Sequence, residues 1–234
     1  MRNILISGSS KGLGKELLRC LSNEDTRIYS MGNRSSTDVD ISVDLRNFEA
    51  TKVAIEKFFE DKDPISILIC NAGSGRPPET KLRKRQLKRH YLELNVKTAE
   101  NLIRASRPFF MPHKTSVVAI SSIAAITNIK GANPEYGDSK RVLNNLVKKL
   151  ALEDAEFGFR YNLISPGNIF FEGSRWSEII SQKPQFVTNL LAKEVPLRNF
   201  ISPEEIADAI EFLSSAGARN ITGLNLVIDG GQAL

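Results

Sequence analysis

Short apolar runs, most of them rich in β-branched residues, alternate with longer amphipathic stretches along almost the whole chain of 234 residues. Seven runs have the character of strands: Asn3–Ser7, Arg27–Met31, Val39–Val43, Ile65–Cys70, Ser116–Ile120, Arg160–Ile164 and Leu224–Ile228. Five stretches have the character of helices: Gly12–Leu21, Asn47–Glu60, Lys81–Arg107, Glu135–Glu156 and Pro203–Ser214. This alternation predicts an α/β fold in which a mainly parallel, seven-stranded sheet has helices on both faces.

The chain shows no internal repeat and no low-complexity linker, and its ten prolines are scattered among the expected ends of elements. We therefore expect one domain over residues 1–234. One helix has a clear start signal. Ser202 is the expected N-cap, Pro203 suits the first helical position, and Glu205 completes a capping box.

A glycine-rich turn, Ser7-Gly8-Ser9-Ser10-Lys11-Gly12-Leu13-Gly14, follows the first expected strand. Its glycines allow a tight turn and let the backbone approach a ligand without an intervening side chain. The helix that begins here points amide N–H groups and its positive dipole end at the turn, which suits the pyrophosphate of a dinucleotide. Glycines at this GxxxGxG spacing also occur in ordinary turns, but the strand–turn–helix context favours nucleotide binding in a doubly wound, Rossmann-like fold.

Two cations occur where the ribose of such a nucleotide is expected. Lys11 lies within the turn, and Arg34 lies 20 residues after Gly14, where NAD-binding chains carry an acid. Cations at these positions favour the 2′-phosphate of NADP(H) over NAD(H). Asp38 and Asp40 follow closely and keep the NAD(H) alternative open.

Tyr136 and Lys140 are four positions apart in an expected helix. This spacing places them on one helix face, where the ammonium group favours the phenolate and lowers the pKa of the tyrosine toward neutrality. Such a tyrosine can exchange a proton with a carbonyl or alcohol oxygen. An exposed helix pair would explain these two residues equally well if they stood alone. However, Ser121 and Ser122 follow a strand at the edge where open α/β sheets bind ligands, and a serine hydroxyl there can hydrogen-bond a reacting oxygen.

Taken together, these motifs resemble the short-chain dehydrogenase/reductase family, in its single-domain branch, over nearly the whole chain. The resemblance implies an oxidoreductase that transfers a hydride between NADP(H) and the carbonyl/alcohol pair of a small molecule, in the reductive direction. It is carried by seven segments in the family's order: residues 7–14, Val43-Asp44-Leu45, Asn71-Ala72-Gly73, Leu94-Asn95-Val96, the set of Ser122, Tyr136 and Lys140, Ser165-Pro166-Gly167-Asn168-Ile169, and Ile228-Asp229-Gly230-Gly231.

The resemblance also implies a role for each matching residue. Tyr136 would be the acid/base, and Lys140 would lower its pKa and hold the nicotinamide ribose. Ser122 would orient and polarise the substrate carbonyl, and Asn95 would hold a water that links Lys140 to solvent. The residues expected to bind the cofactor are Gly8, Ser10, Lys11, Gly12, Leu13, Gly14, Arg34, Asp44, Leu45, Asn71, Ala72, Gly73, Tyr136, Lys140, Pro166, Gly167 and Ile169.

Three features depart from the family pattern. Ser122 and Tyr136 are one residue further apart than is common, which leaves Ser121 as a lesser candidate for the serine. Phe170-Phe171-Glu172 stands where many relatives carry a threonine that contacts the cofactor. Residues 170–200 are expected to form the substrate lid, and they contain the only tryptophan, Trp176. Its ring either stacks on substrate or packs the lid against the core.

The net charge of +5 comes from one short segment, Lys81–His90, which we term the basic block. It holds six of the 32 lysine and arginine residues and no acid, so the other 26 cations against 27 acids leave −1. Leu82, Leu87, Tyr91 and Leu94 are expected to form an apolar stripe that leaves the cations outward. A solvated helix face is the first interpretation. A rim for an anionic or sugar-linked substrate and a subunit contact are the alternatives.

Neither nucleic acid nor a membrane is an expected partner. Nucleic-acid binding would require basic surface elsewhere and stacking aromatics, and no apolar run approaches the ~18 residues of a membrane span. No signal peptide is recognised. Cys20 and Cys70 form no metal or redox motif, so we expect reduced thiols, no metal and a cytoplasmic location.

The family resemblance implies a homo-oligomer, either a dimer or a homotetramer. A cofactor-binding regulatory or scaffold protein that kept the fold without turnover is the rival to an enzyme. The set of Asn95, Ser122, Tyr136 and Lys140 favours the enzyme, because a non-catalytic binder has no need of all four.

Overall fold

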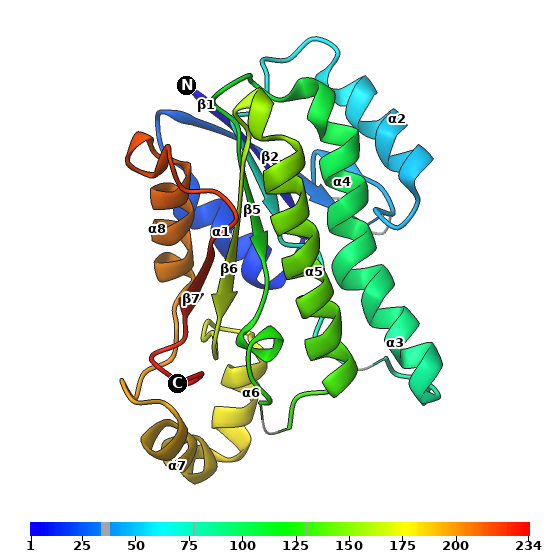
Figure 1. Ribbon diagram of the computed structural model, residues 1–234. Coiled ribbons are helices and arrows are strands. Elements are labelled where there is room, and N and C mark those ends of the chain that lie inside the picture. The colour runs from blue at the N-terminus through cyan, green and yellow to red at the C-terminus, as the bar shows by residue number, and fades with distance from the viewer. Residues whose placement is uncertain (34–37, 77, 130) are drawn as a thin grey trace.

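The computed structural model describes residues 1–33, 38–76, 78–129 and 131–234, and it contains the predicted parallel sheet. The described strands pair in the order β3-β2-β1-β4-β5-β6-β7, and all of these pairings are parallel (Figure 1). Their bounds are β1 Arg2–Ser7, β2 Thr26–Gly32, β3 Ile41–Ser42, β4 Ile67–Cys70, β5 Ser116–Ile120, β6 Arg160–Pro166 and β7 Asn225–Ile228.

Helices cover both faces of this sheet, which confirms the doubly wound architecture. Helices α1 and α8 lie on one face, and α2, α4 and α5 lie on the other (Figure 1). The helix bounds are α1 Gly12–Leu21, α2 Phe48–Phe59, α3 Lys84–Leu92, α4 Thr98–Ser106, α5 Pro134–Glu153, α6 Arg175–Gln182, α7 Pro184–Glu194 and α8 Pro203–Ser214.

The side chains of β1 show how the sequence builds two cores. Ile4 and Ile6 pack under α1 and α8, whereas Leu5 between them packs under the opposite helices. Successive strand residues point to opposite faces, so a continuous apolar run serves both cores. Each such fully buried side chain contributes ~1.5–3 kcal/mol to stability. Because the strand order reverses beside β1, between it and β4, a crevice is expected there at the carboxyl ends of the strands.

Most expected elements shift by one to three residues at an end, and two of them differ in a way that the structure explains. The strand expected over Val39–Val43 is limited to Ile41–Ser42. Before it, the Asp40 carboxylate accepts hydrogen bonds from the backbone N–H and the hydroxyl of Ser30, both at 2.7 Å, so side-chain bonds replace the ladder. The helix expected over Lys81–Arg107 consists of α3, a π-helical turn over Glu93–Lys97, and α4.

Residues 170–200, the expected lid, contain two helices that the sequence reading did not identify, α6 and α7. They lie beyond the carboxyl ends of β5, β6 and β7 (Figure 1). A pair of hydrogen bonds closes the base of this segment. The Phe170 N–H donates to the Ile201 carbonyl at 2.8 Å, and the Ile201 N–H donates to the Asn168 carbonyl at 2.9 Å.

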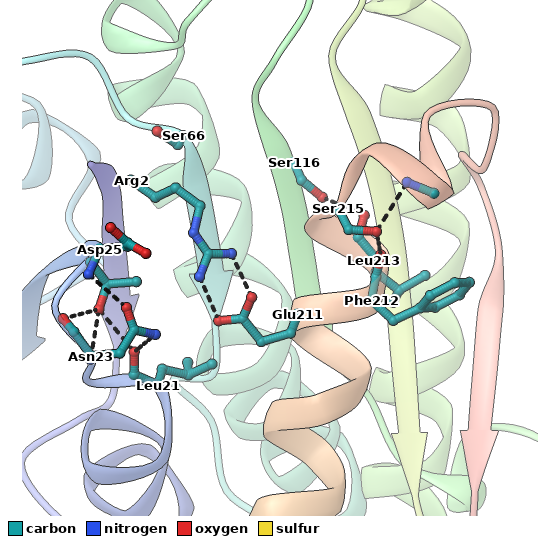
Figure 2. Close-up of polar contacts among 12 residues, drawn as sticks. Arg2, Leu21, Asn23, Asp25, Ser66, Ser116, Glu211, Phe212, Leu213 and Ser215 are labelled. Atoms are coloured by element: carbon teal, nitrogen blue, oxygen red, sulfur yellow. Dashed lines mark hydrogen bonds and ion pairs between the residues drawn. The ribbon is translucent and has the colours of Figure 1, made fainter.

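Helix α8 is fixed at both ends. The predicted capping box is confirmed, because the Ser202 hydroxyl accepts from the Glu205 N–H and the Glu205 carboxylate accepts from the Ser202 N–H. Near its other end, Glu211 receives two hydrogen bonds from Arg2 of β1, at 2.5 and 2.9 Å (Figure 2). The Arg2–Glu211 hydrogen bonds lie at the amino edge of the sheet, opposite the crevice.

Candidate active site

Ser122 and Tyr136 meet beyond the carboxyl end of β5. Ser122 caps a short 3₁₀ turn, where its hydroxyl accepts from the Ala124 N–H at 3.2 Å. Tyr136 lies in the first turn of α5, and its interaction with Ser122 acts to lower the pKa of the phenol. Gly137 makes this approach possible, since a Cβ there would lie 2.6 Å from the Ala124 carbonyl oxygen. Sequence reasoning missed Gly137, although the glycine directly after the tyrosine was a visible signal.

Lys140 lies one helical turn beyond Tyr136 and is buried. Its Nζ donates to the Ile120 carbonyl at 2.8 Å and lies 5.9 Å from the centre of the Tyr136 ring. Burial lowers the pKa of Lys140 to about 8. The lysine is therefore held beneath the tyrosine ring by the end of β5, on the helix face that the spacing predicts.

Asn95 lies in the π-helical turn, a feature that often marks functional positions. Its amide donates to the Ser74 carbonyl at 3.1 Å and to the Ser139 hydroxyl at 3.2 Å. A Cβ at Gly73 would lie 2.5 Å from Asn95 Oδ1 and 3.6 Å from Lys140 Nζ. All four residues expected to be catalytic are thus gathered around the segment that follows β4.

The expected lowering of the Tyr136 pKa is not produced by the protein groups around it. Burial raises the pKa of Tyr136, and its interaction with Ser122 offsets only part of that effect. Tyr91, whose ring lies 5.8 Å away, raises it further. A phenol in this environment is protonated at neutral pH, so it holds a proton that it can donate.

Ser121, the lesser candidate, is placed away from this cluster. Its hydroxyl is buried and donates to Asn144 Oδ1 at 2.6 Å. Its backbone N–H donates to the Ile164 carbonyl of β6. Consecutive residues at the end of a strand point to opposite sides, so only Ser122 reaches Tyr136.

A cavity of about 820 Å³ extends from the glycine-rich turn toward this cluster. Gly8 and Gly12 adopt positive φ angles of +69° and +63°, which side chains disfavour. Asn71 steadies the turn by donating to the Ser7 and Gly8 carbonyls, both at 3.1 Å. The expected cofactor residues that line the cavity are Gly8, Ser10, Lys11, Gly12, Leu13, Asp44, Leu45, Asn71, Ala72 and Gly73.

Several other expected cofactor residues do not line this cavity among the residues described. Gly14 instead packs the helix on the turn, since a Cβ there would lie 2.2 Å from the Gly8 carbonyl oxygen. Ile169 pairs with Ile201 at the base of the lid. Arg34 lies outside the described residues. The remaining four are elsewhere: Pro166 and Gly167 at the end of β6, and Tyr136 and Lys140 in α5.

Sequence reasoning missed two residues at the nucleotide end of this cavity, Asn33 and Arg46. Arg46 forms an ion pair with Asp44, with its Nε at 2.9 Å and an Nη at 2.7 Å from the carboxylate. Asp40, which kept the NAD(H) alternative open, is engaged by Ser30 of β2. Its carboxylate therefore has a structural role between β2 and β3.

A second cavity, of about 590 Å³, lies beside Tyr136. Its walls come from the segment after β4, from the start of α5 and from the start of α6. Trp176 does not line it. The Trp176 ring packs against Phe200, at 5.3 Å between ring centres, within the expected lid. The described lining consists of Gly75, Arg76, Gly131, Ala132, Asn133, Pro134, Tyr136 and Arg175.

The basic block forms the exposed side of α3 and the residues before it. All six of its cations are exposed, and Tyr91 anchors the buried side, as the apolar stripe predicts. None of the six lines the cavity beside Tyr136. Arg85, Lys88 and Arg89 instead border a separate cavity of about 950 Å³ near Asp44. The block is therefore not a rim of the Tyr136 cavity.

The described residues contain no cluster of three or more His, Cys, Asp or Glu side chains placed to hold a metal. Within the same residues, no helix is long and apolar enough to cross a membrane. Cys20 and Cys70 are free thiols, and burial raises the pKa of Cys70 to about 12. A thiol with that pKa is unreactive at neutral pH.

A parallel sheet with a glycine-lined cavity and a Ser–Tyr–Lys cluster at the carboxyl ends of its strands is typical of a nucleotide-dependent oxidoreductase. Residues 12–233 match the family model described as enoyl-(acyl carrier protein) reductase. The oxidoreductase UcpA of Salmonella typhimurium is 27% identical over 252 residues, which cover 100% of this chain and 95% of UcpA.

Solved structures agree with this assignment. A short-chain dehydrogenase/reductase family oxidoreductase from Burkholderia thailandensis is 25% identical with a TM-score of 0.83, covering 99% of this chain and 92% of that one. RhlG of Pseudomonas aeruginosa, solved with NADP, is 24% identical with a TM-score of 0.85, covering 100% and 96%. The chain belongs to the short-chain dehydrogenase/reductase family and is an NAD(P)-dependent oxidoreductase.

Proposed function

We propose that this protein reduces the carbonyl group of a small molecule with NADPH, and that Tyr136 donates the proton. The observation that carries the proposal is the convergence of Ser122, Tyr136, Lys140 and Asn95 beside a cavity at the carboxyl ends of the strands. The raised pKa of Tyr136 supports the reductive direction, because reduction consumes a proton that a neutral phenol holds.

The residues of the larger cavity fit a dinucleotide. Gly8 and Gly12 leave the turn open, and a Cβ at Gly12 would meet nothing within 4 Å. Lys11, the N-cap of α1, makes no side-chain capping bond, so the first amides of α1 are free to bind a pyrophosphate. When bound, a nicotinamide dinucleotide supplies the hydride. Asp44 borders the expected adenine end.

Each catalytic side chain then has a distinct task. Ser122 hydrogen-bonds the carbonyl oxygen and holds it beside the Tyr136 hydroxyl, which protonates that oxygen as charge develops on it. Lys140, with a pKa of about 8, holds the nicotinamide ribose. Asn95 holds a water through which a proton returns from solvent. Residues 170–200 cover the substrate as a lid.

The preference for NADPH is part of the proposal. Lys11 lines the nucleotide end of the cavity, and Asp40, one of the two acids that would favour NAD(H), is bonded to Ser30. RhlG, which has this fold, was solved with NADP. Arg34, a second cation expected at the 2′-phosphate, is assigned from sequence alone, as are a homo-oligomeric assembly of two or four copies and a cytoplasmic location.

Titration with NADPH and NADH, followed by a carbonyl panel, tests the function. We expect tighter binding of NADPH and a loss of roughly 100-fold or more in kcat for Tyr136→Phe, because general acid catalysis contributes factors of this size. Cofactor affinity is expected to change little in that variant. Turnover that survives in Tyr136→Phe would refute the proton donor. Nucleotide binding without reduction of any carbonyl would favour the rival scaffold protein.

A further inference from the structure

The cavity beside Tyr136 receives positive charge from two separate elements. Arg76 belongs to the segment after β4, and Arg175 is the first residue of α6 in the lid. The described lining of this cavity includes no acidic residue. A ligand held there would therefore lie between two guanidinium groups and the Tyr136 hydroxyl.

Of these two guanidinium groups, that of Arg175 has fewer polar contacts with the protein. Arg76 contacts Glu178 at 3.5 Å, and both side chains are more than half exposed, so this ion pair is weak. Arg175 has neither a hydrogen-bond nor an ion-pair partner among the residues described. A guanidinium that lines a cavity and lacks a partner offers parallel N–H donors that match the oxygens of a carboxylate or a phosphate.

Tyr91, which packs against Tyr136, is affected by the charge of Arg175. Its ring is fully buried, lies 5.8 Å from the Tyr136 ring, and carries a hydroxyl with no described hydrogen-bond partner. Burial and the Glu135 carboxylate raise the pKa of this hydroxyl, whereas the charge of Arg175 lowers it. The guanidinium is thus close enough to act electrostatically on the ring that packs against Tyr136.

We propose that the substrate carries a carboxylate or a phosphate, and that Arg175, supported by Arg76, binds this group while the carbonyl faces Tyr136. This inference rests on the proposed function. It assigns recognition of an anion to the lid and the segment after β4, and not to the basic block, whose cations border a different cavity.

Trp176 provides a readout that does not depend on turnover, because it is the only tryptophan and follows Arg175 directly. Malonate and inorganic phosphate, added at constant ionic strength with chloride, are expected to change its fluorescence with saturation. Arg175→Gln should weaken this response at least about tenfold, which corresponds to ~1.4 kcal/mol. Lys183→Gln, which removes an exposed charge from the same lid outside the cavity, should leave it unchanged.

Kinetics with matched substrates test the same site during reduction. A keto acid is compared with its methyl ester, and glyceraldehyde 3-phosphate with glyceraldehyde; the pair with the larger difference identifies the anion. We expect a lower KM for the charged member, and a rise of at least tenfold in that KM for Arg175→Gln, with the neutral member changed less than twofold. Arg175→Lys should restore part of the loss, since it keeps the charge but not the fork of donors.

Equal KM values within both pairs, or equal losses for charged and neutral substrates in Arg175→Gln, would overturn the inference. So would a Trp176 response to anions that is the same in Arg175→Gln and Lys183→Gln. None of these results touches the proposed function, which fails on a different measurement, the lack of NADPH and NADH binding. The fluorescence titration retains its meaning in that case, because it needs neither nucleotide nor turnover.

Discussion

At the scale of single residues, the site combines a tyrosine that burial keeps neutral with a lysine that burial makes only weakly basic. Tyr136 and Lys140 share one helix face, yet the lysine donates to the Ile120 carbonyl and not to the phenol. The protein therefore holds a buried ammonium group that one hydrogen bond stabilises incompletely. Such an arrangement serves catalysis at the expense of stability.

Lys140→Met is expected to abolish turnover without destabilising the fold at pH 7. The folded protein releases the lysine proton near pH 8, whereas the unfolded chain keeps it to about pH 10.5, so holding the charge in the fold costs about 3 kcal/mol at neutral pH. Lys140→Met removes this cost, but it also removes the hydrogen bond to the Ile120 carbonyl, which offsets part of the gain in stability. We expect a free energy of unfolding equal to or up to ~2 kcal/mol above that of the parent protein.

The dependence of the free energy of unfolding on pH tests this prediction. Between pH 8 and 10.5 the unfolded chain binds one more proton at this residue, so the parent protein gains stability as pH rises and Lys140→Met does not. Urea denaturation of both proteins at pH 7 and pH 10 measures the difference, with Lys148→Met as an exposed control on the same helix. A gap between the two proteins that is constant with pH would contradict the lowered pKa.

At the scale of elements, the site depends on how closely α5 approaches the turn after β5. The carbonyl oxygen of Ala124 occupies the space that a Cβ at Gly137 would need. Because the same turn carries Ser122, the separation of these two elements sets the contact between Ser122 and Tyr136. The π-helical turn positions Asn95 in a comparable way. It adds a residue between α3 and α4, which turns the Asn95 side chain toward Gly73.

Gly137→Ala is therefore expected to reduce both stability and kcat. Alanine ordinarily favours a helix by ~1 kcal/mol over glycine, but the overlap with a backbone carbonyl outweighs this, and we expect a net loss of about 1–3 kcal/mol. Thermal denaturation and kcat measure the two effects. Gly217→Ala is the matched control, because the nearest atom to a Cβ there is 3.4 Å away. Unchanged kcat in Gly137→Ala would show that the spacing of α5 is not critical.

The sequence was sufficient to predict the sheet and the helices on its faces, because these depend on local periodicity. Motif order was sufficient to name Asn95, Ser122, Tyr136 and Lys140, which the structure brings together and whose catalytic roles stay a prediction. The sequence was not sufficient where a structural feature depends on contacts between segments that are far apart in the chain. The pairing of β3 with β2 begins only after Asp40, because the Asp40 carboxylate is hydrogen-bonded to Ser30. The π-helical turn has no sequence periodicity that distinguishes it from α-helix. Arg175 gave no signal in sequence, since only the folded lid brings it beside Tyr136.

At the scale of the whole molecule, structural and functional contacts are concentrated at opposite edges of the sheet. The carboxyl edge holds the cavities and the proposed catalytic residues, whereas the amino edge holds the Arg2–Glu211 pair and the hydrogen bond from the Ser116 hydroxyl to the Leu213 carbonyl (Figure 2). A change at the amino edge should therefore alter the stability of the fold and leave the chemistry intact.

Glu211→Gln tests this separation. The Arg2 guanidinium binds the carboxylate at two points, but both side chains are about one-third exposed, so the expected loss is only ~0.5–1 kcal/mol. For a chain of this length that corresponds to a fall of about 1–4 °C in Tm. Calorimetry and steady-state kinetics should show the lower Tm with kcat and KM unchanged, and Glu24→Gln, at an exposed turn, should change neither. A fall in kcat with Glu211→Gln would show that the two edges are coupled.

The paired base of the lid has a consequence for how relatives of this protein diversify. Because Ile169 and Ile201 hold the two ends together, the cost of closing this loop depends weakly on its length, at ~0.6 kcal/mol for each doubling. Segments of different length and sequence can be exchanged on the same stem while the nucleotide cavity is left untouched. The paired base of the lid therefore separates two parts of the molecule. The segment that we propose binds substrate can change between relatives, while the sheet and the nucleotide cavity stay the same.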